Sequence, residues 1–246
     1  MPVLVHSSAY LLVSHGSRDP RPQKAAVHLA DLVSQRLSSP DRSPIVATAA
    51  LELAPIPLYK AIYQQAQKHQ LERLYIVPLF LLPGVHSRED IPAEVATAQA
   101  QLDQTELYLH PYIGSYPGMI AVLEQQFQQL SDGARLLISH GSRREGANQP
   151  IEAIAAKLNA KAAYWAVEPS LEAQVTALVN AGHTEIVIQP YFLFSGGIID
   201  AIAQTVAMLQ SKFPQVRFHW GQALGATPAL ADLIVRGIHP SGQLFQ

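Results

Sequence analysis

An internal repeat is the strongest constraint on how this chain of 246 residues can fold. Three segments of the first half recur in the same order in the second half. They are LLVSHGSR at 11–18 with LLISHGSR at 136–143, VPLFL at 77–81 with QPYFL at 189–193, and IGSYP at 113–117 with LGATP at 224–228. Because the order is kept, the chain reads as a duplicated domain with its junction near residues 130–135.

Each half alternates short apolar runs with segments of helical spacing. The expected strands lie near residues 10–15, 44–51, 73–81, 105–110, 134–140, 162–167, 184–193 and 216–220. These runs are rich in Val, Ile and Leu, which is typical of strands buried on both faces. Strand–helix alternation favours a parallel sheet with right-handed crossovers. We therefore expect an α/β protein with two similar doubly wound parallel-sheet lobes of flavodoxin-like βα repeats, residues 1–130 and 131–246, facing a central cleft.

The composition excludes several classes of protein. With 48% hydrophobic and 15% charged residues, the chain is not disordered, and without cysteine it can form no thiolate metal site, iron–sulfur cluster or Cys nucleophile. The net charge is −2 and the sequence contains no Lys/Arg-rich run, so we expect neither nucleic acid nor a membrane as partner. We find no signal-peptide pattern, and the longest apolar run is shorter than the roughly 20 residues of a membrane span. A cytoplasmic location is the expectation.

Two histidines follow expected strands, His15 after the first and His86 after the third. The carboxyl ends of parallel strands meet at one edge of the sheet, which is where ligands bind in such folds. Two imidazoles there would suit a divalent first-row ion such as Fe, Co, Ni or Zn. Structural alternatives remain open, in which His15 bonds to a neighbouring carbonyl and His86 is a polar loop residue. Under either interpretation, we expect Asp90 to cap the helix that begins at Ile91 or Pro92.

The second half keeps only part of this pattern. His140 corresponds to His15, whereas Ile198 stands where the first half has His86. We therefore expect the first lobe to carry the active site and the second lobe to be degenerate. Arginines in the surrounding loops could bind carboxylates of a ligand through paired hydrogen bonds; they are Arg18, Arg88, Arg143 and Arg144.

The segments SHGSRDPR, VPLFLLPGVHSREDIP and PYFLFSGGIIDAI resemble those of the sirohydrochlorin chelatases, in the long, duplicated form called CbiX or SirB. The resemblance covers nearly the whole chain. It implies a chelatase-like fold and a lyase, a class II, ATP-independent chelatase that inserts Co²⁺ or Fe²⁺ into sirohydrochlorin in cobalamin or siroheme synthesis. It further implies that the tetrapyrrole and the metal are substrates and that no cofactor is permanently bound.

The resemblance also implies roles for individual residues. His15 corresponds to the metal-binding and proton-accepting histidine of the family, and His86 to its second metal ligand. For the acidic site residue after the second strand, Glu52 and Glu168 are both candidates. The expected tetrapyrrole-binding residues are Leu81, Leu82, Pro83, Gly84 and Val85 of the loop before His86, together with Arg18 and Arg88.

Other functions compete with this interpretation. Histidine phosphatases also place a His-Gly loop after the first strand, but an arginine precedes their histidine and Ser14 precedes His15 here. A carrier that binds metal and tetrapyrrole without inserting the ion would use the same ligands. The choice among Co²⁺, Fe²⁺ and Ni²⁺ stays open, and the fusion of two lobes in one chain favours a monomer.

Overall fold

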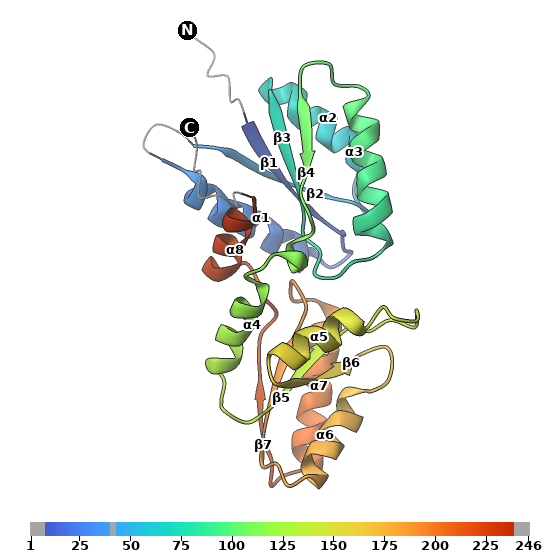
Figure 1. Cartoon of the computed structure of the whole chain (residues 1–246), viewed down its shortest axis with the longest axis vertical. Helices are drawn as coiled ribbons and strands as arrows, with labels where there is room; N and C mark the ends of the chain where they lie inside the picture. The colour runs from blue at the N-terminus through green and yellow to red at the C-terminus, as the bar shows by residue number, and fades with distance from the viewer. Residues whose placement is uncertain (1–7, 40–42, 239–246) are drawn as a thin grey trace. The chain divides into compact units, whose positions relative to one another are not determined.

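The computed structural model describes residues 8–39 and 43–238, and these form two four-stranded parallel sheets flanked by helices (Figure 1). The expected α/β class and the expected alternation of strands and helices are confirmed. Within these described ranges, no helix has both the length and the apolar character needed to cross a bilayer.

The first repeat contains β1 (Ser8–Ser14), α1 (Pro20–Leu37), β2 (Ile45–Ala50), α2 (Leu58–His69), β3 (Arg73–Pro78), the π-helical turn η1 (His86–Asp90), α3 (Ile91–Gln99), β4 (Glu106–Leu109), the 3₁₀ turn η2 (Ile113–Ser115) and α4 (Met119–Gln128). The second repeat contains β5 (Ala134–Ser139), α5 (Gln149–Lys157), β6 (Ala160–Tyr164), α6 (Leu171–Asn180), β7 (Glu185–Pro190), α7 (Gly197–Lys212), β8 (Arg217–Trp220) and α8 (Pro228–Ile238). Strands β3 and β7 end earlier than expected, each at a proline, which has no N–H to donate to a sheet.

The first sheet has the strand order β2-β1-β3-β4, with every pair parallel. Its central strand β1 is buried, and the side chains of Leu11, Leu12 and Val13 are fully shielded from solvent. Leu11 and Val13 belong to a core shared with α2 and α3. Helices α1 and α8 pack against each other on the opposite side of this sheet (Figure 1).

This strand order fixes where a ligand site can form. The chain leaves β1 toward β2 on one side and continues with β3 and β4 on the other side. The direction of the crossovers therefore reverses between β1 and β3. In parallel α/β sheets, ligands bind beyond the carboxyl ends of the strands at such a reversal. His15 directly follows β1 and His86 begins the helical turn after β3, so both lie at this edge.

The second sheet repeats the arrangement, with the order β6-β5-β7-β8 and parallel pairing throughout. Its core joins β5 and β7 to α6 and α7 through buried aliphatic side chains such as Leu136, Val175, Ile188 and Ile202. The two sheets thus share one topology, as the duplicated sequence predicts.

The two compact units do not coincide with the lobes expected at residues 1–130 and 131–246. The first unit ends at Pro117 and resumes at Ala226, and the second unit is Gly118–Gly225. Each repeat therefore gives its last helix to the other unit. Helix α8 packs on α1, where Asp232 pairs with Arg36, and α4 packs against β7.

This exchange of helices leads to a testable prediction. Ile234 of α8 and Phe127 of α4 are both fully buried, and truncating such a side chain to alanine costs about 2–5 kcal/mol of the free energy of unfolding. We expect Ile234→Ala to lower the protection of backbone amides from hydrogen exchange in β1, β3 and α1. Phe127→Ala should instead lower it in β5 and β7.

Hydrogen exchange followed by mass spectrometry checks both variants in one experiment. Met208→Ala serves as the control, because that side chain is 64% exposed. If Ile234→Ala loosens the second sheet rather than the first, the assignment of α8 to the first unit is wrong.

Candidate metal centre

The loop after β1 presents His15 next to the end of β2. The backbone N–H of Glu52 donates to the carbonyl of His15 at 2.9 Å, so the two loops are joined directly. Between them, Gly16 has φ of +102°, and a Cβ on this residue would lie 2.0 Å from the carbonyl oxygen of Glu52. Only glycine fits this backbone conformation and this close approach. The local fold thus brings Glu52 beside His15.

The sequence led us to expect His86 in an irregular loop, but the structure places it elsewhere. It begins the π-helical turn η1, in which the N–H of Ile91 bonds to the carbonyl of His86, and this turn runs directly into α3. The expected role of Asp90 as an N-cap of α3 is wrong: its backbone is helical, and its side chain makes no cap hydrogen bond. A cap has no function there because the helical backbone already continues through Asp90.

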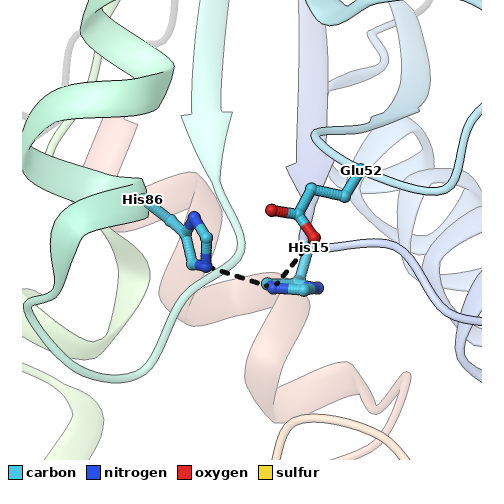
Figure 2. A group of neighbouring side chains, drawn as sticks. All are labelled: His15, Glu52 and His86. Atoms are coloured by element: carbon cyan, nitrogen blue, oxygen red, sulfur yellow. Dashed lines mark hydrogen bonds and ion pairs between the residues drawn. The ribbon is translucent and has the colours of Figure 1, made fainter.

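Three donor-bearing side chains converge at this edge of the sheet (Figure 2). The Nε2 atoms of His15 and His86 are 3.2 Å apart, and Nε2 of His15 is 3.9 Å from Oε2 of Glu52. All three potential ligand atoms lie within 4.8 Å of one another. Among the residues that the structure describes, no other set of three or more His, Asp and Glu side chains converges in this way.

The separation of the two imidazoles fits a shared ion. Two nitrogens that each lie 2.0–2.1 Å from one tetrahedral ion are about 3.3 Å apart. Each Nδ1 has an oxygen nearby, the Gly16 carbonyl at 3.3 Å for His15 and an Asp90 carboxylate oxygen at 2.7 Å for His86. With a proton on each Nδ1, both Nε2 lone pairs and the Glu52 carboxylate face one point, an arrangement that a cation stabilises. The alternative role considered for His15, a bond to a neighbouring carbonyl, is thus compatible with ligation.

Solvent reaches all three side chains. The side chains of His15 and Glu52 are 49% and 50% exposed, and that of His86 is 37% exposed. The Phe80 ring lies near both histidines, with its centroid 6.3 Å from each imidazole centroid. The three side chains are therefore open to solvent and border an apolar ring.

The loop before His86 is held in place by the 3₁₀ turn η2. The N–H of Gly114 donates to the carbonyl of Phe80 at 3.0 Å, and a Cβ on Gly114 would lie 1.9 Å from the carbonyl oxygen of Leu81. The loop presents half-buried Leu81, Leu82, Pro83 and Val85 and exposed Gly84. The loop is mostly apolar and leads directly to His86.

Of the two expected arginines, Arg18 lies in the loop after β1 and Arg88 lies in the turn η1, and neither has an ion-pair partner among the described residues. Arg18 and Arg88 are both exposed. Arg21, in contrast, is paired with Asp19, and its side-chain hydrogen bonds hold the pKa of that carboxyl below its usual value. Arg18 and Arg88 are thus available to an anionic ligand, whereas Arg21 is not.

The second unit lacks the corresponding set of ligands. There the N–H of Ala166 donates to the carbonyl of His140, just as the N–H of Glu52 donates to His15 in the first unit. Ala166 is therefore the counterpart of Glu52. Glu168 lies two residues farther on, where its carboxylate accepts a hydrogen bond from the N–H of Ser170. Of the two acidic candidates, the structure brings Glu52 to the histidine pair.

Two residues of this site were not predicted from the sequence. Asp90 looked like a helix cap, although its spacing of four residues from His86 is a signal for side chains on one helical face. Phe80 looked like part of a strand, and nothing in the sequence distinguishes it from an ordinary core residue.

Comparison with known proteins agrees with the repeat and with the fold. A sequence model of the CbiX family matches residues 9–130 and again residues 134–240. A sirohydrochlorin ferrochelatase of Priestia megaterium is 26% identical over 243 residues, which cover 93% of this chain and 88% of that protein. A sirohydrochlorin cobaltochelatase of the same organism is 24% identical over 245 residues, which cover 93% of this chain and 78% of that protein. The structure of SirB from Bacillus subtilis with Fe³⁺ has a TM-score of 0.79 at 21% identity, covering 96% of both chains. This chain belongs to the CbiX family.

Proposed function

We propose that this protein is a lyase that inserts Co²⁺ or Fe²⁺ into sirohydrochlorin without ATP. The observation that carries the proposal is the convergence of His15, Glu52 and His86 beside an apolar loop, at the edge of the sheet where ligands bind. The family supports it, because similar members are named sirohydrochlorin ferrochelatase and cobaltochelatase. The metal is a substrate here, and the reaction needs no resident cofactor.

His15, His86 and Glu52 would hold the ion while it loses water. Imidazole and carboxylate donors suit divalent first-row ions, and neither histidine is fixed by a buried network that would make release slow. The exposed fractions of about half for His15 and Glu52 leave one side of the ion open to the incoming macrocycle. The ion then exchanges these ligands for pyrrole nitrogens.

Insertion also removes the pyrrole N–H protons, and the histidines that release the metal become free to accept them. A neutral imidazole is a suitable base near neutral pH. His15 is the better placed acceptor, because its Nε2 atom lies between His86 and Glu52, at 3.2 Å and 3.9 Å. A proton taken up there would be stabilised by the adjacent carboxylate.

The macrocycle would pack on the apolar loop formed by Leu81, Leu82, Pro83, Gly84 and Val85. Ligand sites of this kind combine an apolar wall with a few polar groups that fix orientation. The free guanidiniums of Arg18 and Arg88 would bind the peripheral carboxylates of the tetrapyrrole. The second unit, with Ala166 and Ile198 in place of Glu52 and His86, would bind no metal.

Insertion measured by absorbance tests the proposal. Sirohydrochlorin is mixed anaerobically with Co²⁺ or Fe²⁺, with and without the protein, and the spectral change is followed over time. We expect the protein to accelerate insertion well above the rate without protein, and the faster metal indicates the pathway. If the protein binds sirohydrochlorin but leaves the rate unchanged, it is a carrier and the proposal is wrong.

A further inference from the structure

Asp90 makes a short contact with one of the proposed metal ligands. Its Oδ2 atom is 2.7 Å from Nδ1 of His86. The side chain of His86 is 37% exposed and that of Asp90 is 44% exposed. A carboxylate has no proton to donate, so the proton of this bond belongs to Nδ1. In a neutral imidazole, the lone pair is then on Nε2, the atom that faces His15.

We propose that Asp90 is a positioning residue that fixes the tautomer and the ring orientation of His86 for metal binding. This inference rests on the proposed function only in taking His86 as a ligand. Histidines that bind metals commonly donate their second N–H to a carboxylate, and the loss of that partner typically weakens metal binding about 10–100-fold. Asp90 acts on the ion through His86 and is not itself among the converging ligand atoms.

The backbone of the turn is built for this contact. In η1 the N–H of Ile91 bonds to the carbonyl five residues earlier, at His86, instead of four. The Ser87 hydroxyl accepts a hydrogen bond from the N–H of Gly84 and lies within donating distance of the carbonyl of Gly84. These contacts connect the start of the turn to the preceding loop. The carboxylate of Asp90 is not used as a helix cap and is therefore available to His86. π-Helical turns occur frequently at functional sites.

The second repeat supplies an independent comparison. Strands β3 and β7 end at Pro78 and Pro190. The helices that follow contribute core residues at the same spacing, and these residues are Ile91, Val95 and Ala98 in α3 and Ile202, Val206 and Leu209 in α7. The first repeat thus has one more residue between these points. That residue is accommodated in η1, whereas the corresponding part of the second unit is α-helical from Gly197 onward.

The repeat without the extra residue also has no histidine between residues 191 and 204, and Ile198 stands where His86 is expected. Ala201 precedes Ile202 where Asp90 precedes Ile91, and the aspartate of the second repeat, Asp200, lies one residue earlier. The ligand histidine, the π-helical turn and an aspartate at this position therefore occur together in the first repeat and not in the second. A structural role in starting α3 would not explain this association, because α7 starts without a π-helical turn and has its acidic residue, Asp200, at a different position.

Three variants test the proposal: Asp90→Ala, Asp90→Asn and, as a matched control, Glu89→Ala. Glu89 is exposed on the same turn, so its substitution removes the same charge one residue away. We expect Asp90→Ala to weaken Co²⁺ binding about 10–100-fold in a calorimetric titration. Asp90→Asn should recover part of this loss, because an amide oxygen still accepts from Nδ1. Glu89→Ala should bind Co²⁺ like the wild type.

The tautomer of His86 provides a second readout that does not depend on metal. In metal-free protein labelled with ¹⁵N-histidine, with His86 assigned by comparison with His86→Ala, we expect a protonated Nδ1 and an unprotonated Nε2. Asp90→Ala should raise the population with the proton on Nε2. An unprotonated Nδ1 in the wild type, or equal Co²⁺ affinity of Asp90→Ala and Glu89→Ala, would overturn the proposal. Neither readout uses insertion, so a protein that passes both tests but accelerates no insertion would refute only the proposed function.

Discussion

We expect His15→Ala to lower the rate of metal insertion by about 10²–10⁴-fold, the range typical for loss of a general acid or base. The substitution removes the Nε2 atom that lies 3.2 Å from His86 and 3.9 Å from Glu52. The ion loses a ligand, and the pyrrole protons lose the acceptor that stands between the other two donors. No neighbouring side chain can replace it, because the other donors at this edge are already part of the set.

The internal repeat supplies a matched control for this prediction. His140→Ala removes the same side chain from the same position after the central strand of the second sheet, where Ala166 replaces Glu52. We expect this variant to insert metal at a rate within a few-fold of the wild type. Both histidines are exposed, so neither substitution should change the thermal midpoint of unfolding appreciably. If His140→Ala is inactive and His15→Ala is active, the metal centre has been assigned to the wrong unit.

Most of the fold could be predicted from the sequence because the strands are short apolar runs between helical segments. The exchange of α4 and α8 between the units could not be predicted. The buried residues of α8, such as Leu230 and Ile234, form an apolar stripe like that of α4, with Val122 and Phe127. Such a stripe shows that a helix has a buried face, but it carries no information about which of the two units that face packs against.

The site was predictable to the extent that strand ends determine it. His15 and His86 follow neighbouring strands of a parallel sheet, so their proximity follows from topology alone. The choice between Glu52 and Glu168 depends on the end of β2 and on the backbone bond from Glu52 to His15. That register is a tertiary feature. The contact of Asp90 with His86 depends on one additional residue in a helical turn, which no local propensity reveals.

Gly16→Ala is expected to destabilise the protein strongly. Gly16 has φ of +102°, a region that is costly for a residue with a side chain, and the new Cβ would lie 2.0 Å from the carbonyl oxygen of Glu52. Backbone strain and overpacking of this kind each cost about 1–3 kcal/mol, so we expect a loss of roughly 2–5 kcal/mol in the free energy of unfolding. The clash is with backbone, so no side-chain rotation can relieve it.

The same methyl group should also weaken metal binding, because the simplest relief of the clash moves the loop that carries Glu52 away from His15. We expect Gly16→Ala to reduce both the denaturant midpoint and the affinity for Co²⁺. Gly197→Ala is the control: a Cβ there meets no atom within 4 Å, so the change in stability should stay within about 0.5 kcal/mol. Normal Co²⁺ affinity in a destabilised Gly16→Ala protein would mean that Glu52 keeps its place without the close contact of the two loops, or that it is not a ligand. Glu52→Gln separates these two cases, since it removes the charge of the carboxylate and leaves the backbone unchanged.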